Sequence, residues 1–230
     1  MNSNINAKNS KLIPKTNNTI ENRIYNVCGI VAPILFVTIF TIDGWFRHGY
    51  SPISRFVSEL SIGHGGWVQM TNFFITGLLL FIFGLGQLSY KINNKPTKAI
   101  SYIFMVMGFC LFGSGFFTTD PSVLFNQHTF HGIVHGILGA IFFTLAPVSC
   151  FVIYKTLKIN SNNKLFKRWS LFICLVLLIG IVFLKISQFP QNELFQYKGL
   201  IQRIILISYM LWLFSYAFRN ILKRSENVKA

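Results

Sequence analysis

Charged residues are scarce in this sequence, and acidic residues are the scarcest of them. Only 12% of the 230 residues are charged, and Asp and Glu together number 6, whereas roughly a quarter of the residues in a soluble domain are charged. Together with a hydrophobic content of 52%, this composition excludes a soluble enzyme. In a water-soluble chain, a net charge of +15 would indicate nucleic-acid binding, but a membrane explains this excess of Lys and Arg better.

The sequence also lacks the motifs that hold nucleotides. It contains no Gly-rich phosphate-binding loop, no dinucleotide fingerprint and no G-x-S-x-G elbow. Nucleotide-driven work is therefore excluded, and no nucleic-acid motif is present. The few cysteines all fall within apolar runs, unlike the spaced cysteines of a secreted disulfide protein. We interpret them as small buried hydrophobic residues: Cys28, Cys110, Cys150 and Cys174.

Long apolar runs, in contrast, fill most of the chain and predict six membrane-spanning helices. Each run is close to the about 20 residues that a helix needs to cross a bilayer. In chain order, the runs are Tyr25–Ile42, Val68–Tyr90, Ile100–Phe117, Thr129–Tyr154, Trp169–Leu184 and Leu200–Phe218. We expect an all-α polytopic bundle, with a membrane domain over 24–219 and polar basic tails at 1–23 and 220–230.

The basic residues between these runs are distributed unevenly and predict the topology. The two tails, the segment after the second run and the segment after the fourth run carry nearly all of the net charge of +15. Because basic segments stay on the cytoplasmic side, both termini are expected in the cytoplasm. A basic cytoplasmic face also attracts anionic headgroups, so membrane lipids are the expected partners, although topology alone explains most of the bias.

The first outer segment has the spacing of a short amphipathic helix. Ser51 followed by Pro52 is typical of an N-cap and a first helical position. Apolar residues then recur at i, i+3, i+4 and i+7, namely Ile53, Phe56, Val57 and Leu60. We expect this helix to lie on the outer membrane surface or over the mouth of the bundle. Its polar face carries Arg55 and Glu59, which form either an ordinary i,i+4 salt bridge or part of a site.

A second outer cluster has the spacing of metal ligands. His128, His131 and His135 are separated by three and then four positions, so on a helix they share one face. Two of them can chelate one metal ion, and a carboxylate from Asp120 or Glu59 can complete the shell as in a catalytic zinc site. A hydrogen-bonded polar network or a proton relay is the alternative. The small residues Gly132 and Gly136, followed by Gly139 and Ala140, predict close helix packing with this span at the bundle centre.

Three stretches of the sequence resemble a known family: GYSPISRFVSELSIG, GFFTTDP and HGIVHG. They are similar to the prokaryotic membrane family catalogued as domain of unknown function nine-nine-eight, and the resemblance covers Tyr25 to Arg219. Its motif residues correspond here to Ser58, Glu59, Leu60, Asp120, His131 and His135. The resemblance implies a multi-helix protein of a prokaryotic cytoplasmic membrane, in a family without an established activity. Thr118 stands where a proline is expected.

Three functions fit these features. The first is a noncatalytic membrane protein that senses or scaffolds, in which Glu59, Asp120, His131 and His135 form a polar network. The second is a zinc-dependent membrane hydrolase acting on a lipid or lipid-like substrate. In it, Asp120, His131 and His135 bind the metal, Glu59 is the general base and Ser58 a hydrogen-bonding partner. A transporter is the third. The ionisable groups of a transporter are expected near mid-membrane, whereas the candidate groups of this sequence lie in or beside the outer segments, so this function fits less well.

Overall fold

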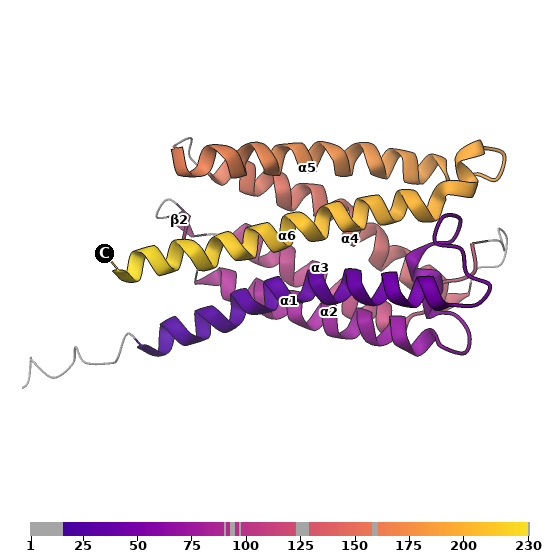
Figure 1. Ribbon diagram of the computed structural model, residues 1–230, viewed down its shortest axis with the longest axis horizontal. Helices are drawn as coiled ribbons and strands as arrows, with labels where there is room; N and C mark the ends of the chain where they lie inside the picture. The colour runs from indigo at the N-terminus through magenta and orange to yellow at the C-terminus, as the bar shows by residue number, and fades with distance from the viewer. Residues whose placement is uncertain are drawn as a thin grey trace, which may run out of the picture.

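The computed structural model is a bundle of six long helices (Figure 1). It describes residues 16–89, 91–92, 95–96, 98–122, 129–157 and 161–229. The long helices are α1 (Thr16–Phe46), α2 (Gly66–Leu88), α3 (Lys98–Phe116), α4 (Phe130–Thr156), α5 (Ser161–Ile186) and α6 (Lys198–Lys229). Two short 3-10 helices, η1 (Val57–Ser61) and η2 (Glu193–Tyr197), precede α2 and α6, and a two-residue pair, β1 (Lys91–Ile92) with β2 (Lys95–Pro96), joins α2 to α3.

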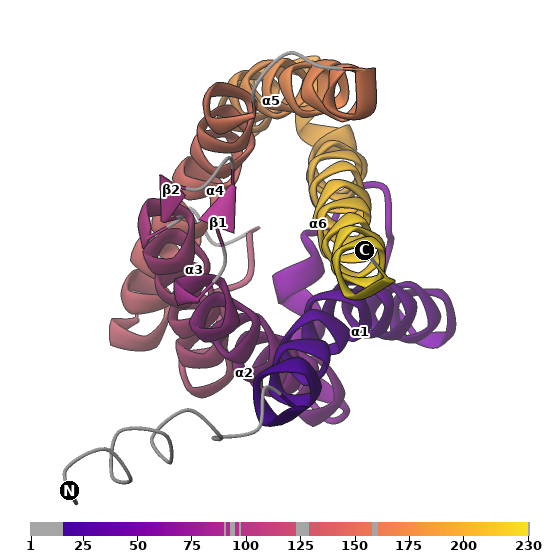
Figure 2. The same cartoon turned by 90° about the vertical axis from the view of Figure 1, so that its left-hand side faces the viewer.

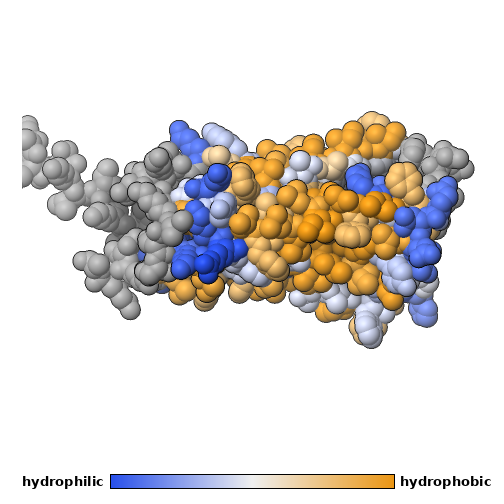
Figure 3. Space-filling view, turned by 90° about the horizontal axis from the view of Figure 1, so that it is seen from above, coloured by the Kyte–Doolittle hydropathy of each residue, from blue (hydrophilic) through white to orange (hydrophobic). Residues whose placement is uncertain are grey.

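Six apolar segments of 19 to 31 residues, each long enough to cross a membrane, coincide with the long helices, and the last of them begins at Glu193 in η2. The outer surface of the bundle shows an apolar belt between two polar ends (Figure 3). Large apolar side chains are exposed in this belt, among them Phe109 at 64% and Ile179 at 58%. Such a continuous apolar surface is suited to lipid and not to water. The chain is therefore a multi-pass membrane protein, and the predicted six-helix architecture is confirmed.

The helices follow one another around a ring when the bundle is viewed along its axis, and α6 closes the ring against α1 (Figure 2). Aromatic side chains of α6 fill the interior of this ring. Tyr209, Trp212 and Tyr216 are each exposed by 1% or less, and their rings stack with centroids 5.8 Å apart. This column of rings is the centre of the core.

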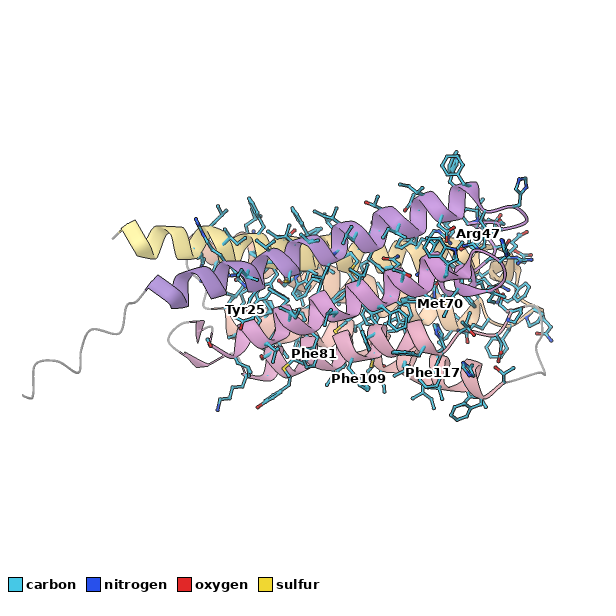
Figure 4. All side chains as sticks on the ribbon, turned by 90° about the horizontal axis from the view of Figure 1, so that it is seen from below. Tyr25, Arg47, Met70, Phe81, Phe109 and Phe117 are labelled. Carbon is cyan, nitrogen blue, oxygen red and sulfur yellow. The ribbon has the colours of Figure 1, made fainter. Side chains whose placement is uncertain are left out.

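The tightest helix contact lies between α2 and α3, which Figure 4 shows along Phe81 and Phe109. A Cβ atom on Gly108 would lie 2.5 Å from the backbone nitrogen of Phe81, and one on Gly77 would lie 2.7 Å from the carbonyl oxygen of Gly108. The two backbones touch because neither position carries a side chain. The close contact between α2 and α3 therefore depends on Gly77 and Gly108.

The two ends of the bundle differ. The first residues of α1 and the last residues of α6 lie at one end, which we call the terminal end (left in Figure 1). The other end holds η1 together with the segments that join α1 to α2 and α3 to α4, and we call it the η1 end. The candidate site residues that the structure describes therefore lie at the end of the bundle opposite to the start of α1 and the end of α6.

The segment between α1 and α2 does not form the amphipathic helix predicted from its apolar spacing. Residues 52–55 form turns, and η1 is a 3-10 helix of five residues that are all buried. Val57 and Leu60, two apolar positions of that predicted helix, are exposed by only 2% and 0%. The segment therefore folds into the mouth of the ring, where η1 packs against α1, α2 and α6.

Hydrogen bonds to α6 explain this difference. An α-helix over this segment would pair the carbonyl of Ile53 with the N–H of Val57. Instead, the Ile53 carbonyl accepts from the backbone N–H of Leu200 at 2.9 Å, and the Val57 N–H donates to Oε1 of Gln202 at 2.6 Å. Two hydrogen bonds to a distant helix thus replace one hydrogen bond within the segment. The apolar spacing of the segment itself could not predict these distant partners.

Candidate functional site

Arg203 of α6 fixes the segment that leads to η1. Its Nη1 donates to the carbonyl oxygens of Pro52 at 2.7 Å and Arg55 at 3.1 Å, and its Nη2 donates to the hydroxyl of Tyr50 at 2.5 Å. The side chain is 9% exposed, and in the described parts of the chain no carboxylate forms a salt bridge with it. Backbone dipoles and the phenol therefore solvate this buried charge.

Tyr50 completes this arrangement from the opposite side. Burial raises the pKa of its phenol, although the bond from Arg203 acts in the other direction. The hydroxyl thus stays protonated at neutral pH and donates to the carbonyl oxygen of Phe56 at 2.9 Å. Tyr50 therefore forms a bridge between Arg203 and the start of η1.

Glu59 joins η1 to the segment between α3 and α4. Its Oε1 accepts from the backbone N–H of Phe56 at 3.0 Å and from the hydroxyl of Ser122 at 2.7 Å. The residue is 5% exposed, and its Oε2 is buried without a hydrogen-bond partner in the described residues. Arg55 is exposed, and Glu59 bonds to Ser122 instead of forming the i,i+4 salt bridge that was one of the two predictions.

Asp120 supports the first turn of α4. Its Oδ2 accepts from the backbone N–H of Thr129 at 3.0 Å, and its Oδ1 accepts from the Thr129 hydroxyl at 2.7 Å. Thr129 in turn caps the helix by accepting from the N–H of Gly132 at 3.0 Å. The carboxylate occupies the space where a Cβ atom of residue 132 would sit. A negative group here also favours the helix N-terminus electrostatically.

The two described histidines of the predicted cluster lie one turn apart and both contact Phe117, which Figure 4 labels at the η1 end. His135 is 8% exposed, and its Nδ1 donates to the carbonyl oxygen of Phe117 at 2.7 Å. Since a carbonyl oxygen only accepts, Nδ1 carries the proton, and in the neutral form of the ring Nε2 is an acceptor. The backbone of Ser114 is a second hydrogen-bond partner of His135. His131 is exposed, with its ring centroid 5.5 Å from that of Phe117.

The structure shows other contacts for the residues that were expected to bind zinc together. Both carboxylate oxygens of Asp120 are bonded to Thr129, and His131 lies at the surface. In residues 16–122 and 129–229, as far as they are described, no three His, Cys, Asp or Glu side chains are grouped to hold a metal ion. His128 lies outside the described residues, and the zinc site stays a prediction.

A cavity lies in the η1 half of the ring and has a volume of about 50 Å³ for the centres of water-sized molecules, which is room for a few waters. Every long helix except α5 contributes to its lining, and so does η1. Four aromatic residues line it, namely Phe36, Phe73, Phe142 and Phe143. Four polar residues line it as well, namely Ser58, Ser114, His135 and Gln202. Aromatic walls with a few polar groups are typical of a small-molecule site.

On the side of the cavity where α4 faces α5, residues of α4 line the cavity and residues of α5 do not. The two helices touch near the terminal end, where Nζ of Lys167 donates to the Leu157 carbonyl at 2.9 Å and lies 4.7 Å from the Tyr154 ring centroid. Toward the η1 end, α4 diverges from α5 (Figure 1). A Cβ atom on Gly136 or Gly139 would there meet nothing within 4 Å, and Gly139 lines the cavity.

The expectation that small residues place α4 at the bundle centre is therefore wrong. Gly132 is tightly packed, but against the Asp120 carboxylate and not against another helix. Gly136 is exposed and faces open space. The sequence pattern specifies how closely a neighbour can approach, and it does not specify whether a neighbour is there.

Sequence reasoning identified some of the cavity residues and missed others. Ser58 and His135 were candidates, and both line the cavity. Gln202 and Ser114 were missed, as was the role of Arg203. The available signal was the presence of polar side chains within apolar spans, which are uncommon and mark internal sites in membrane proteins.

Comparisons with known proteins agree with the resemblance in the sequence motifs. No curated protein and no solved structure matches the chain. A family match covers residues 30–219, and the family is described as Protein of unknown function (DUF998). Since these residues include η1 and all the cavity-lining positions, the chain belongs to this family with the candidate site inside the shared region.

Proposed function

We propose that this protein is a membrane-embedded binding protein that takes up a small lipid-like molecule in the cavity at the η1 end. Sensing of that molecule, without chemical conversion, is the function that the geometry supports best. The observation that carries the proposal is the cavity itself, with aromatic walls, four polar groups and an edge at Gly139 that faces open space. Binding sites for small molecules combine these features.

The aromatic column of α6 supports binding over transport. Tyr209, Trp212 and Tyr216 stack along the ring interior and are almost completely buried. A carrier needs a route between its site and both membrane faces. These three rings lie between the cavity and the terminal end, so a bound molecule exchanges more easily with the η1 end and the surrounding lipid.

The proposed location is the cytoplasmic membrane of a prokaryotic cell. Basic residues gather in the sequence segments of the terminal end, which the positive-inside rule assigns to the cytoplasm. The cavity then lies in the outer leaflet, and the partners are membrane lipids and not nucleic acids or nucleotides. Cysteine substitutions in the segment of His48 and in that of Lys91 test this orientation with a membrane-impermeant thiol reagent. Labelling of the first alone in intact cells supports it, and labelling of the second alone rejects it.

Zinc-dependent hydrolysis is the second candidate, and one observation favours it. Nδ1 of His135 donates to a backbone carbonyl, and metal-binding histidines are commonly oriented in this way. Asp120, His131 and His135 are the proposed ligands, with Glu59 as general base and Ser58 beside it. About one zinc per chain in the purified protein, lost in a His131→Ala, His135→Ala variant, would support this candidate. Absence of zinc from the purified wild type rejects it.

Substitutions of two glycines test the binding proposal. Gly139 and Gly136 both have open space beside their Cα atoms, but only Gly139 lines the cavity. We expect native mass spectrometry of the gently purified wild type to show a retained lipid-like molecule. Gly139→Phe fills the edge of the cavity and loses the molecule, while Gly136→Phe retains it. Equal retention in both variants would contradict binding in this cavity.

A further inference from the structure

The chemistry of the cavity lining specifies the ligand more closely. Resting on the function proposed above, we infer that the ligand is an uncharged lipid whose head carries a hydroxyl group. The head lies in the cavity and donates this hydroxyl to Nε2 of His135. The hydrocarbon tail leaves past Gly139, on the side of α4 that faces α5, and lies in the apolar belt.

The cavity lining offers no counter-charge to an anionic head. Its lining residues, as far as the structure describes them, include no Asp, Glu, Lys or Arg. The two cations of α6 at this end are engaged elsewhere: Arg203 binds backbone carbonyls and Tyr50, and Nζ of Lys198 lies 3.4 Å from the ring centroid of Phe195. Burial of a carboxylate or phosphate without a counter-charge costs far more than a hydrogen bond returns.

The polar atoms of the lining select a group that both donates and accepts. Nδ1 of His135 donates to Phe117, so Nε2 of the neutral ring can only accept a hydrogen bond. Oε1 of Gln202 accepts from Val57, so the amide nitrogen of Gln202 is left to donate. A hydroxyl can donate to the imidazole and accept from the amide at the same time, whereas an ester oxygen can only accept. A lipid alcohol therefore satisfies both side chains.

The surroundings of Gly139 explain the direction of the tail. Gly139 is half-buried at the edge of the cavity, and Gly136 and Ala140 beside it are exposed. Ile137 and Ile141 on α4 are exposed by 56% and 38%. These apolar side chains belong to the lipid-facing belt, so a hydrocarbon tail that leaves at Gly139 remains in contact with apolar surface.

Three probes with one hydrocarbon chain and different heads test the inference. Oleyl alcohol has a hydroxyl, methyl oleate accepts hydrogen bonds but cannot donate, and oleate at pH 8 is charged. Dissociation constants are measured by thermal unfolding titrations of the full chain in detergent. We expect oleyl alcohol to bind about tenfold more tightly than methyl oleate, which corresponds to one hydrogen bond, and oleate to bind weakest.

A pair of histidine variants links this difference to one atom. His135→Asn keeps an amide N–H for the Phe117 carbonyl and removes the Nε2 acceptor, and His64→Asn is the control, because His64 is exposed and does not line the cavity. His135→Asn should weaken the binding of oleyl alcohol about tenfold and leave the binding of methyl oleate unchanged, while His64→Asn changes neither. An unchanged unfolding temperature without ligand confirms that each variant is folded.

The outcomes separate this inference from the proposed function. If oleate or methyl oleate binds as tightly as oleyl alcohol and Gly139→Phe abolishes that binding, the cavity binds lipids but the hydroxyl assignment is wrong. If oleyl alcohol binds equally to wild type and Gly139→Phe, or if none of the three probes binds, both proposals fail. Tight binding of oleyl alcohol that depends on both Gly139 and His135 supports both.

Discussion

The backbone N–H of Val57 donates to Oε1 of Gln202 at 2.6 Å and joins residues that are 145 positions apart in the chain. This bond holds η1 in the mouth of the ring and leaves the amide nitrogen of Gln202 available beside the cavity. Both ends of the bond are buried. The position of η1 and the polarity of the cavity are therefore set by the same side chain.

Replacement of Gln202 by Leu is expected to destabilise the protein. The buried N–H of Val57 loses its acceptor, and an unsatisfied buried donor costs about 1–3 kcal/mol. Thermal unfolding in detergent should show a lower Tm for Gln202→Leu than for the wild type. Gln188→Leu is the control, because Gln188 is exposed, and it should leave the Tm unchanged. Equal Tm values for both variants would show that the bond contributes nothing.

Replacement of Arg203 by Met should free the segment that precedes η1. The change removes the bonds to Pro52, Arg55 and Tyr50, and loss of a buried network of this kind costs about 2–4 kcal/mol. Limited proteolysis should cleave the variant faster within residues 50–56. Arg55→Met is the matched control, since the Arg55 side chain is exposed. Protection of the segment in Arg203→Met would contradict the assigned role.

Two glycines of α4 should respond in opposite directions to the same substitution. A Cβ atom at residue 132 collides with the Asp120 carboxylate, whereas one at residue 136 meets nothing within 4 Å. Gly132→Ala should therefore lower the Tm, because Asp120 can no longer bond to Thr129. Gly136→Ala should raise stability by up to about 1 kcal/mol, since Ala favours a helix over Gly. A gain of stability in Gly132→Ala would show that Asp120 does not support the helix.

The contact between α2 and α3 gives another matched pair. Gly108→Ala places a methyl group 2.5 Å from the backbone nitrogen of Phe81, and the backbone cannot move aside cheaply. We expect a loss of about 1–3 kcal/mol from overpacking. At Gly113, a Cβ would meet only the flexible end of Leu138 at 2.9 Å, so Gly113→Ala should cost less. Denaturation of the two variants in the same detergent measures the difference, and equal losses would contradict the close approach.

The sequence correctly identified the spans but not the segment between the first two. Hydropathy is sufficient for a span, because a helix in lipid must satisfy its own backbone groups within the segment. In the segment that contains Ile53 and Val57, apolar spacing predicted an amphipathic helix on the outer membrane surface or over the mouth of the bundle. The same spacing also arises when apolar residues are buried inside the ring, and bonds from Leu200 and Gln202 decided between the two.

The candidate site was predicted in the same incomplete way. His131 and His135 were placed on one helix from their spacing, and the structure shows both against Phe117. Spacing could not show that His135 faces a cavity while His131 lies at the surface. It also could not show that the Asp120 carboxylate is bonded to Thr129. These contacts depend on how α3 and α4 cross, which is a property of packing.

The sequence by itself determined the six spans, the gathering of basic residues at the terminal end and the presence of polar residues near η1. Each of these follows from local composition, since transfer of a segment into lipid depends mainly on its own side chains. Only the tertiary structure decided that η1 enters the ring, that Gln202 and His135 line one cavity and that Gly139 lies at its edge. These features depend on contacts between residues that are distant in the sequence. A polar group buried in the membrane needs a hydrogen-bond partner, and tertiary packing determines which residue is close enough to be that partner.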